Sequence, residues 1–183
     1  MQEAKEKGVF VEESSVRGCG VWIDEGRVIL HCGNKIYCEG ELVSFEDLRS
    51  EYSYVAARKL INPAREALND YEAFRLRKIC EAVTWENTLS GTLLAGWLVI
   101  APICAALTYR PHVYITGEAE SGKSTVMDRI IRPVLGKIAL CVDGGTTEPG
   151  VREQQGKDGR PLEAEEPETP PTRGEEHTLL RRA

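Results

Sequence analysis

The first 43 residues alternate short apolar runs with turn residues. The runs, each paired with its turn, are Val21–Ile23 with Asp24-Glu25-Gly26, Arg27–His31 with Gly33-Asn34, and Lys35–Cys38 with Glu39-Gly40. Glycine, Asn and Asp at each break supply the backbone angles that tight turns need. The pattern from Val9 to Val43 therefore predicts a small antiparallel β-meander. Because so few strands are marginally stable alone, we expect the meander to pack on the rest of the chain.

From Phe45 to Val83 the apolar spacing becomes helical, after a break at Asn62-Pro63. The run YEAFRLRKICEAV places its apolar side chains near one stripe of a helix. That stripe consists of Tyr71, Phe74, Ile79, Cys80 and Val83, widened by Leu76. Residues 46–86 are accordingly predicted to form a helical connector.

The stretch from Asn87 to Tyr109 contains no charged residue. A bilayer is spanned by about 20 apolar residues, so a membrane span is one interpretation. Pro102 and several small or polar residues favour the other, a core helix buried inside a protein. We expect the core helix and no membrane association.

The next segment alternates strand and helix patterns. His112–Thr116 is predicted to be a strand, Lys123 to about Leu135 a helix that Pro133 distorts, and Ile138–Val142 a second strand. Thr147 is placed to cap a further helix. Such alternation predicts an α/β fold with a parallel sheet flanked by helices.

The chain after residue 154 is rich in Glu, Pro, Gly and Arg and poor in apolar residues. Such a segment buries too little surface to offset chain entropy, so we expect a disordered tail. The predicted organisation is a meander over 1–45, the connector over 46–86, a partial core over 87–154 and the tail over 155–183.

Charge and cysteine content narrow the classes of function. The net charge is −6, and no Lys/Arg run suggests a basic arm for nucleic acid. The start MQEAKEKG lacks the apolar run of a secretion signal, so we expect a cytoplasmic protein with reduced thiols. A zinc site from Cys19, His31, Cys32 and Cys38 is the disfavoured alternative, because His31 and Cys32 adjoin on a predicted strand and face opposite ways.

One motif carries specific chemistry. The segment from Gly117 to Thr125 fits G-x-x-x-x-G-K-[ST], the phosphate-binding loop (Walker A) that precedes a helix. Its consecutive amides and the helix N-terminus bind phosphate oxygens, Lys123 adds charge at the β- and γ-phosphates, and Ser124 offers a hydroxyl to Mg²⁺. The predicted nucleotide-binding residues are Gly117, Glu118, Ala119, Glu120, Ser121, Gly122, Lys123, Ser124 and Thr125. ATP and Mg²⁺ are the expected ligands, although Glu118 and Glu120 should weaken phosphate affinity.

Segments around this loop resemble the helicase/ATPase portion of phage- and prophage-type primase–helicase proteins. They are Arg17–Arg27, Leu94–Pro102, Arg110–His112 and Gly144–Arg152. The resemblance implies a partial P-loop NTPase core, and a DNA replication motor that assembles into a homo-oligomeric ring around DNA. It also places Thr146–Arg152 near the nucleotide or the DNA channel, with a solvated helix cap as the alternative.

The family pattern then requires a strand ending in Asp-Glu, which hold Mg²⁺ and position the attacking water. The corresponding stretch runs from Arg160 to Glu166. Glu165 is the candidate metal ligand and Glu166 the candidate catalytic residue beside Lys123. A solvated acidic run is favoured over this strand, because Glu163 falls where an apolar side chain belongs.

Nucleotide binding with impaired hydrolysis is therefore expected. The alternatives are a non-enzymatic interaction module with a vestigial loop, a small phosphotransferase, and a membrane protein.

Overall fold

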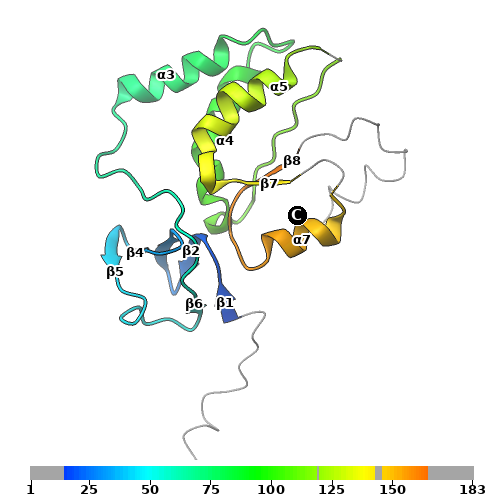
Figure 1. Cartoon of the computed structure of the whole chain (residues 1–183). Helices are drawn as coiled ribbons and strands as arrows, with labels where there is room; N and C mark the ends of the chain where they lie inside the picture. The colour runs from blue at the N-terminus through cyan, green and yellow to red at the C-terminus, as the bar shows by residue number, and fades with distance from the viewer. Residues whose placement is uncertain (1–14, 119, 143–145, 165–183) are drawn as a thin grey trace, which may run out of the picture.

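The computed structural model of the chain describes residues 15–118, 120–142 and 146–164 (Figure 1). It is a mixed α/β structure with helices and small sheets. The β-meander lies at one end, helices α3, α4 and α5 lie toward the other, and strands β7 and β8 lie between (Figure 1). The coarse α/β expectation is confirmed by this arrangement.

The predicted meander is confirmed and has four strands. They are β2 (Gly20–Asp24), β3 (Arg27–His31), β4 (Ile36–Cys38) and β5 (Glu41–Val43), each antiparallel to its neighbour in chain order. A separate parallel pair, β1 (Val16–Arg17) with β6 (Ser53–Tyr54), lies beside them. The part of the predicted meander before residue 15 lies outside the described residues.

Two turns of the meander share one backbone signature. Glu25 and Gly26 have φ angles of 51° and 81°, and Glu39 and Gly40 have 51° and 86°. Two consecutive left-handed residues are typical of the two-residue hairpin turn whose twist matches that of the flanking strands. Each glycine therefore fixes the register of the strands it joins, Asp24 opposite Arg27 and Cys38 opposite Glu41.

The meander core is centred on a buried histidine. His31 is 1% exposed, beside the fully buried Ile29 and Ile36. Its Nδ1 accepts a hydrogen bond from the Gly33 amide at 3.2 Å, and its Nε2 lies 3.1 Å from the Val55 carbonyl oxygen. An acceptor Nδ1 and a donor Nε2 define the neutral ring. Burial accordingly lowers the pKa of His31 below its usual value of 6.5.

The helical connector predicted over 46–86 is confirmed only at helix α3 (Asp70–Glu81), because residues 46–69 are non-helical apart from strand β6, and α3 also corrects the predicted apolar face. Asn69 caps the helix, with Glu72 completing a capping box. The side chains that meet the core are Leu76, Cys80 and Val83. Tyr71, Phe74 and Ile79 are instead 71%, 49% and 51% exposed. The stripe is narrow because α4 is the helix packed against α3, so only one side of α3 is covered.

Helix α4 (Ser90–Ile100) is the apolar helix predicted from the uncharged stretch. Its inner side chains pack with those of the helical run after the phosphate-binding motif. This core contains Leu94, Ala95, Leu98, Ala101, Val126, Ile130, Ile131 and Leu135. At Pro102 the α-helix gives way to a 3₁₀ segment, η1 (Ala101–Ala106), which packs on β2. Within the described ranges, every helix is too short or too polar to cross a bilayer.

The strand predicted over 112–116 is wrong. Residues 111–117 pair with no strand in the described part of the chain. Val113 and Ile115 do pack on the core, whereas His112 and Tyr114 are exposed, so the two-residue period is present. That period indicates which side chains face inward, but a strand also needs an adjacent edge with free hydrogen-bonding groups. The indole Nε1 of Trp97 instead ties this segment to α4 through the Pro111 carbonyl, at 3.0 Å.

The helix predicted after the loop runs without interruption from Lys123 to Leu135, but its middle turn is wider than an α-helical one. It comprises α5 (Lys123–Val126), the π-helical η2 (Met127–Ile131) and α6 (Arg132–Leu135). The Arg132 amide bonds to the Met127 carbonyl five residues back. Pro133 has no amide to continue the ladder, which agrees with the predicted distortion.

A short 3₁₀ turn, η3 (Gly136–Ile138), leads into a parallel strand pair. The pair is β7 (Leu140–Val142) with β8 (Leu162–Ala164), and α7 (Glu148–Gln155) connects them. The strand predicted at 138–142 is confirmed over Leu140–Val142, because Ile138 belongs to η3. The Thr147 cap is confirmed, since the Thr147 side chain accepts from the Gly150 amide.

The expected tail from residue 155 is corrected over residues 155–164, because this segment is built into the fold. The Gly18 amide bonds to the Lys157 carbonyl at 2.7 Å, the Cys19 amide to Asp158 Oδ1 at 2.8 Å, and the Gly159 amide to the Cys19 carbonyl at 2.7 Å. The polar composition gave no sign of this, because backbone groups and the Asp158 carboxylate, rather than apolar side chains, make these hydrogen bonds. Residues 165–183 of the expected tail lie outside the described residues.

We expect Gly159→Ala to destabilise the chain by about 2 kcal/mol, because a Cβ at this position would lie 2.5 Å from Ala105 Cβ and 2.8 Å from the Trp22 ring. Urea unfolding measures the change. As a control, Gly150→Ala places its Cβ against side-chain ends at 3.1 and 3.4 Å and should change stability much less. Equal losses in both variants would contradict the close packing at Gly159.

The free energy of unfolding should fall on acidification through pH 6.5. The pKa of His31 is lowered in the folded chain, so the unfolded chain binds the proton first as the pH drops. The loss should increase as the pH falls below 6.5, for as long as the ring stays neutral in the folded chain. Urea titrations at pH 7.5 and 5.5 measure it. His31→Gln should flatten the dependence, whereas His112→Gln, at an exposed position, should retain it.

Candidate functional site

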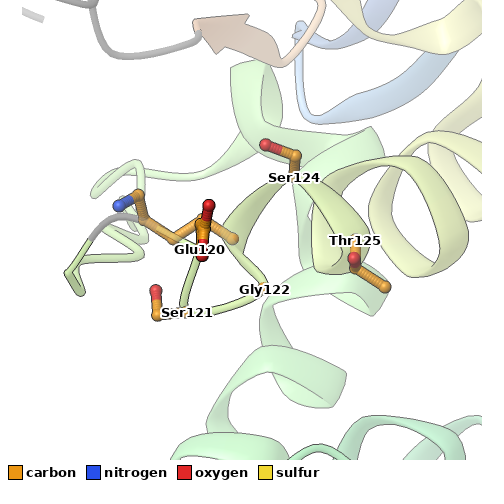
Figure 2. A pocket seen from close by; sticks show the side chains of 6 residues that line it. Glu120, Ser121, Gly122, Ser124 and Thr125 are labelled. Carbon is orange, nitrogen blue, oxygen red and sulfur yellow. The ribbon is translucent and has the colours of Figure 1, made fainter.

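The candidate site is the loop between residue 116 and helix α5, seen in Figure 2. It turns sharply at its end, where the Ser121 amide bonds to the Glu118 carbonyl at 3.2 Å. Glu120 and Gly122 both have positive φ angles, 62° and 94°. Alternation of this kind turns backbone amides toward one side, which is how anion-binding concavities form.

The backbone requires glycine at one of the two motif glycines. Gly122 is the N-cap of α5 in a left-handed conformation that other side chains rarely adopt. A Cβ at Gly117 would lie 2.6 Å from Ser121 Oγ, the end of a short side chain that can rotate away. The backbone therefore requires glycine at Gly122, whereas Gly117 is packed closely only against the Ser121 side chain.

The Lys123 ammonium lies over the loop rather than in bulk solvent. Its Nζ donates to the Gly117 carbonyl at 2.6 Å and to the Glu118 carbonyl at 3.2 Å. An arriving phosphate would compete for this ammonium with two neutral carbonyls, and charge-assisted bonds to an anion are the stronger ones. The side chain is thus held near the position from which it can contact a polyphosphate.

An open hollow of about 260 Å³ lies against the loop. It is lined by Glu120, Ser121, Gly122, Lys123, Ser124 and Thr125. Figure 2 shows Ser124 and Thr125 on the first helical turn, with side chains that leave the helix in different directions. Both are exposed, as are Glu118 and Glu120. First-turn amides have no acceptor within their own helix, so they are available to an anion.

These features fit the phosphates of a nucleotide with Mg²⁺. The loop amides, the lysine ammonium and the serine hydroxyl are part of the set of groups that such binding uses. The structure thus brings eight of the nine predicted loop residues together, and Ala119 lies outside the described residues. Glu165 and Glu166, the predicted acidic pair, also lie outside them. In the part of the chain described, no group of three or more His, Cys, Asp or Glu side chains could hold a metal ion.

Sequence reasoning missed an ion pair beneath the loop helix. Glu163, expected in a solvated acidic run, is 5% exposed in the middle of β8. Its Oε1 accepts from Arg132 Nε at 2.7 Å, and Cys141 Sγ lies 3.5 Å from its Oε2. Arg132 also pairs with Asp128 on the same helix. The expectation failed because a carboxylate can be buried when a cation partners it.

The sequence contains a weak indication that Arg132 and Glu163 are paired charges. Arg132 lies four residues after Asp128, as in a helical ion pair, and Glu163 lies between two apolar residues, Leu162 and Ala164. The pair joins the helix that begins at the loop to the strand that precedes Glu165.

The chain matches no protein-family model, no curated protein and no solved structure. A functional assignment therefore depends on the geometry of the loop and its surroundings.

Arg132→Leu should destabilise the chain by about 2 kcal/mol, because it leaves the Glu163 carboxylate buried without its cation. The double variant Arg132→Leu/Glu163→Leu should recover most of this loss, since two apolar side chains pack where an ion pair stood. Urea unfolding of the single and double variants measures the coupling. Additive losses would show that the pair is not a coupled unit.

Proposed function

We propose that this chain binds the triphosphate of ATP or a related nucleotide, with Mg²⁺, through residues 117–125. The observation that carries the proposal is the Lys123 ammonium, which lies 2.6 Å from the Gly117 carbonyl above a loop of left-handed turns. In this position it faces the concavity that phosphates would enter.

Each residue has a role in that binding. Gly122 starts the helix, so that first-turn amides and the helix dipole face the anion. Lys123 exchanges two carbonyl contacts for phosphate oxygens, which neutralises charge between the β- and γ-phosphates. Ser124 supplies a hydroxyl to Mg²⁺, the ion that compensates the remaining charge. Glu118 and Glu120 are exposed on the loop and reduce the affinity by repulsion.

The larger assignment is part of a phage-type DNA replication helicase or primase–helicase. Its support is the resemblance of the flanking segments together with the order of loop, helix, strand, helix and parallel strand. Glu165 and Glu166 come directly after β8 in sequence, where the family carries its Mg²⁺ ligand and catalytic acid. DNA binding through a homo-oligomeric ring belongs to the same proposal.

Hydrolysis is proposed to be slow. Fast turnover needs a placed water and donors that stabilise the transition-state charge. The segment that would precede the loop as a strand is unpaired in the described chain, so the loop is held by α4 through Trp97 instead of by a sheet. A loop held in this way can bind phosphates without presenting them to a fixed water.

Lys123→Ala should weaken Mg²⁺-dependent binding of a fluorescent ATP analogue at least tenfold, because one charge-assisted contact is worth about 1.5–3 kcal/mol. Fluorescence anisotropy with the full chain measures the dissociation constant with and without Mg²⁺. Lys137→Ala removes an exposed lysine in η3, just after the helical run that begins at Lys123, and is the matched control.

Equal affinity in the two variants would contradict the proposed site. Absence of Mg²⁺-dependent binding in the unmodified chain would favour the interaction module with a vestigial loop. Brisk steady-state ATP hydrolysis that Lys123→Ala abolishes would overturn the claim of slow turnover while leaving the binding site intact.

A further inference from the structure

Two buried cysteines at the end of the meander take no part in the candidate nucleotide site. Cys19 and Cys32 are 3% and 2% exposed, and both are free thiols. Among the described residues no group of three or more His, Cys, Asp or Glu side chains could bind a metal ion. His31, which adjoins Cys32, turns to the opposite face of the sheet. The two thiols are therefore considered as a pair.

The register of the meander sets Cys19 opposite Cys32. Strands β2 and β3 are antiparallel, and their pairing ends with Gly20 opposite His31. The next pair outward is Cys19, just before β2, and Cys32, just after β3. Side chains that lie opposite each other in an antiparallel ladder point to the same face. The two thiols accordingly lie on one side of the sheet.

Backbone hydrogen bonds show which kind of cross-strand pair this is. The Cys19 amide donates to Asp158 Oδ1 at 2.8 Å, and the Cys19 carbonyl accepts from the Gly159 amide at 2.7 Å. The Cys32 amide donates to the Lys35 carbonyl at 2.8 Å. Both amides and the Cys19 carbonyl are thus bonded away from the opposite cysteine, as in a non-hydrogen-bonded pair.

The spacing of such a pair suits a disulfide. In a non-hydrogen-bonded pair the two Cα atoms are about 4.5 Å apart and the side chains are at their closest. A disulfide joins Cα atoms that are about 4.4–6.8 Å apart, so the strands can be linked where they stand. The thiols also influence each other: burial raises the pKa of Cys19, and Asp158 and Cys32 raise it further.

We propose that Cys19 and Cys32 are a modification site, at which a small-molecule disulfide oxidises them to a reversible cross-strand disulfide. One cysteine, as the thiolate, attacks a sulfur of the small disulfide, forms a mixed disulfide and releases one small thiolate. The other cysteine, also as the thiolate, attacks the protein sulfur of the mixed disulfide and releases the second small thiolate. The two cysteines lose two protons and two electrons, and the small disulfide is reduced to two thiols.

Burial makes this exchange slow. It raises the pKa of Cys32 as well as that of Cys19, which lowers the fraction of reactive thiolate. Residues 157–159 bond to the backbone at Cys19, so exchange should follow opening of that contact. Gly159→Ala loosens the contact and should be oxidised several times faster than Gly150→Ala by the same concentration of oxidised glutathione. Equal rates would overturn this opening as the step that admits the oxidant.

Peptide mass spectrometry of the full chain tests the site after equilibration with oxidised and reduced glutathione. Free thiols are alkylated and the chain is digested with trypsin, which cuts after Arg17, Arg27 and Lys35. The expected product is peptide 18–27 linked to peptide 28–35, each of which contains one cysteine. Its equilibrium constant should be at least tenfold larger for the folded chain than for the chain in concentrated urea, because the fold holds the thiols together.

Urea unfolding supplies a second readout. The oxidised chain should unfold at a higher urea concentration than the reduced chain, because the cross-link restricts the unfolded chain. Cys32→Ala should remove this difference between oxidising and reducing buffer. Cys38→Ala should retain it, since Cys38 lies opposite Glu41 on the meander and is not part of the pair.

Three results would overturn the proposal. In the first, the folded chain gains only glutathione adducts. In the second, Cys19 or Cys32 is linked to one of the other four cysteines instead of to its cross-strand neighbour. In the third, the linked peptides are no more abundant in the folded chain than in urea. The outcome is independent of nucleotide binding, because the pair lies outside the loop at 117–125.

Discussion

The fold depends on a backbone contact between two segments far apart in the sequence. Residues 157–159 lie along the start of β2, where they exchange three hydrogen bonds with Gly18 and Cys19. The contact is possible because glycines meet on both sides: Gly20 forms a bridge with Gly159, which also lies against Trp22 and Ala105. This contact places the chain that follows α7 so that residues 162–164 can form β8 beside β7. Without it, β7 would have no parallel partner and Glu163 no buried site.

The position of the candidate nucleotide site depends on strand β8, which the contact at residues 157–159 brings into place. Glu163 in β8 fixes Arg132, and Arg132 lies on the helical run that begins at Lys123. Trp97 holds the other side by bonding to Pro111, just before the loop. The loop at 117–125 is therefore positioned by the ion pair, the indole contact and the apolar packing of the segments on either side of it, rather than by a paired strand before it.

The sequence predicted local structure better than it predicted partners. Turn residues located the meander, and the Gly-Lys-Ser motif located the loop, because each depends on the backbone preferences of a few adjacent residues. The strand expected at His112–Thr116 failed, since pairing depends on a distant edge. Tyr71, Phe74 and Ile79 were assigned to the core because spacing shows that a helix has an apolar face but not how many neighbours cover it. Glu163 and Gly159 were missed because their partners lie more than 30 and 50 residues away, respectively.

The π-helical turn at Met127–Ile131 has a consequence for how this helix can evolve. A π turn is equivalent to one extra residue inside an α-helix, and one residue corresponds to about 100° of rotation. Deleting a residue here would restore regular winding, but it would turn Arg132 away from Glu163 relative to Lys123. The π turn sets the rotation about the helix axis between Lys123, at the loop, and Arg132, which pairs with Glu163. Length variation in this helix is therefore constrained even where the side chains themselves are exposed.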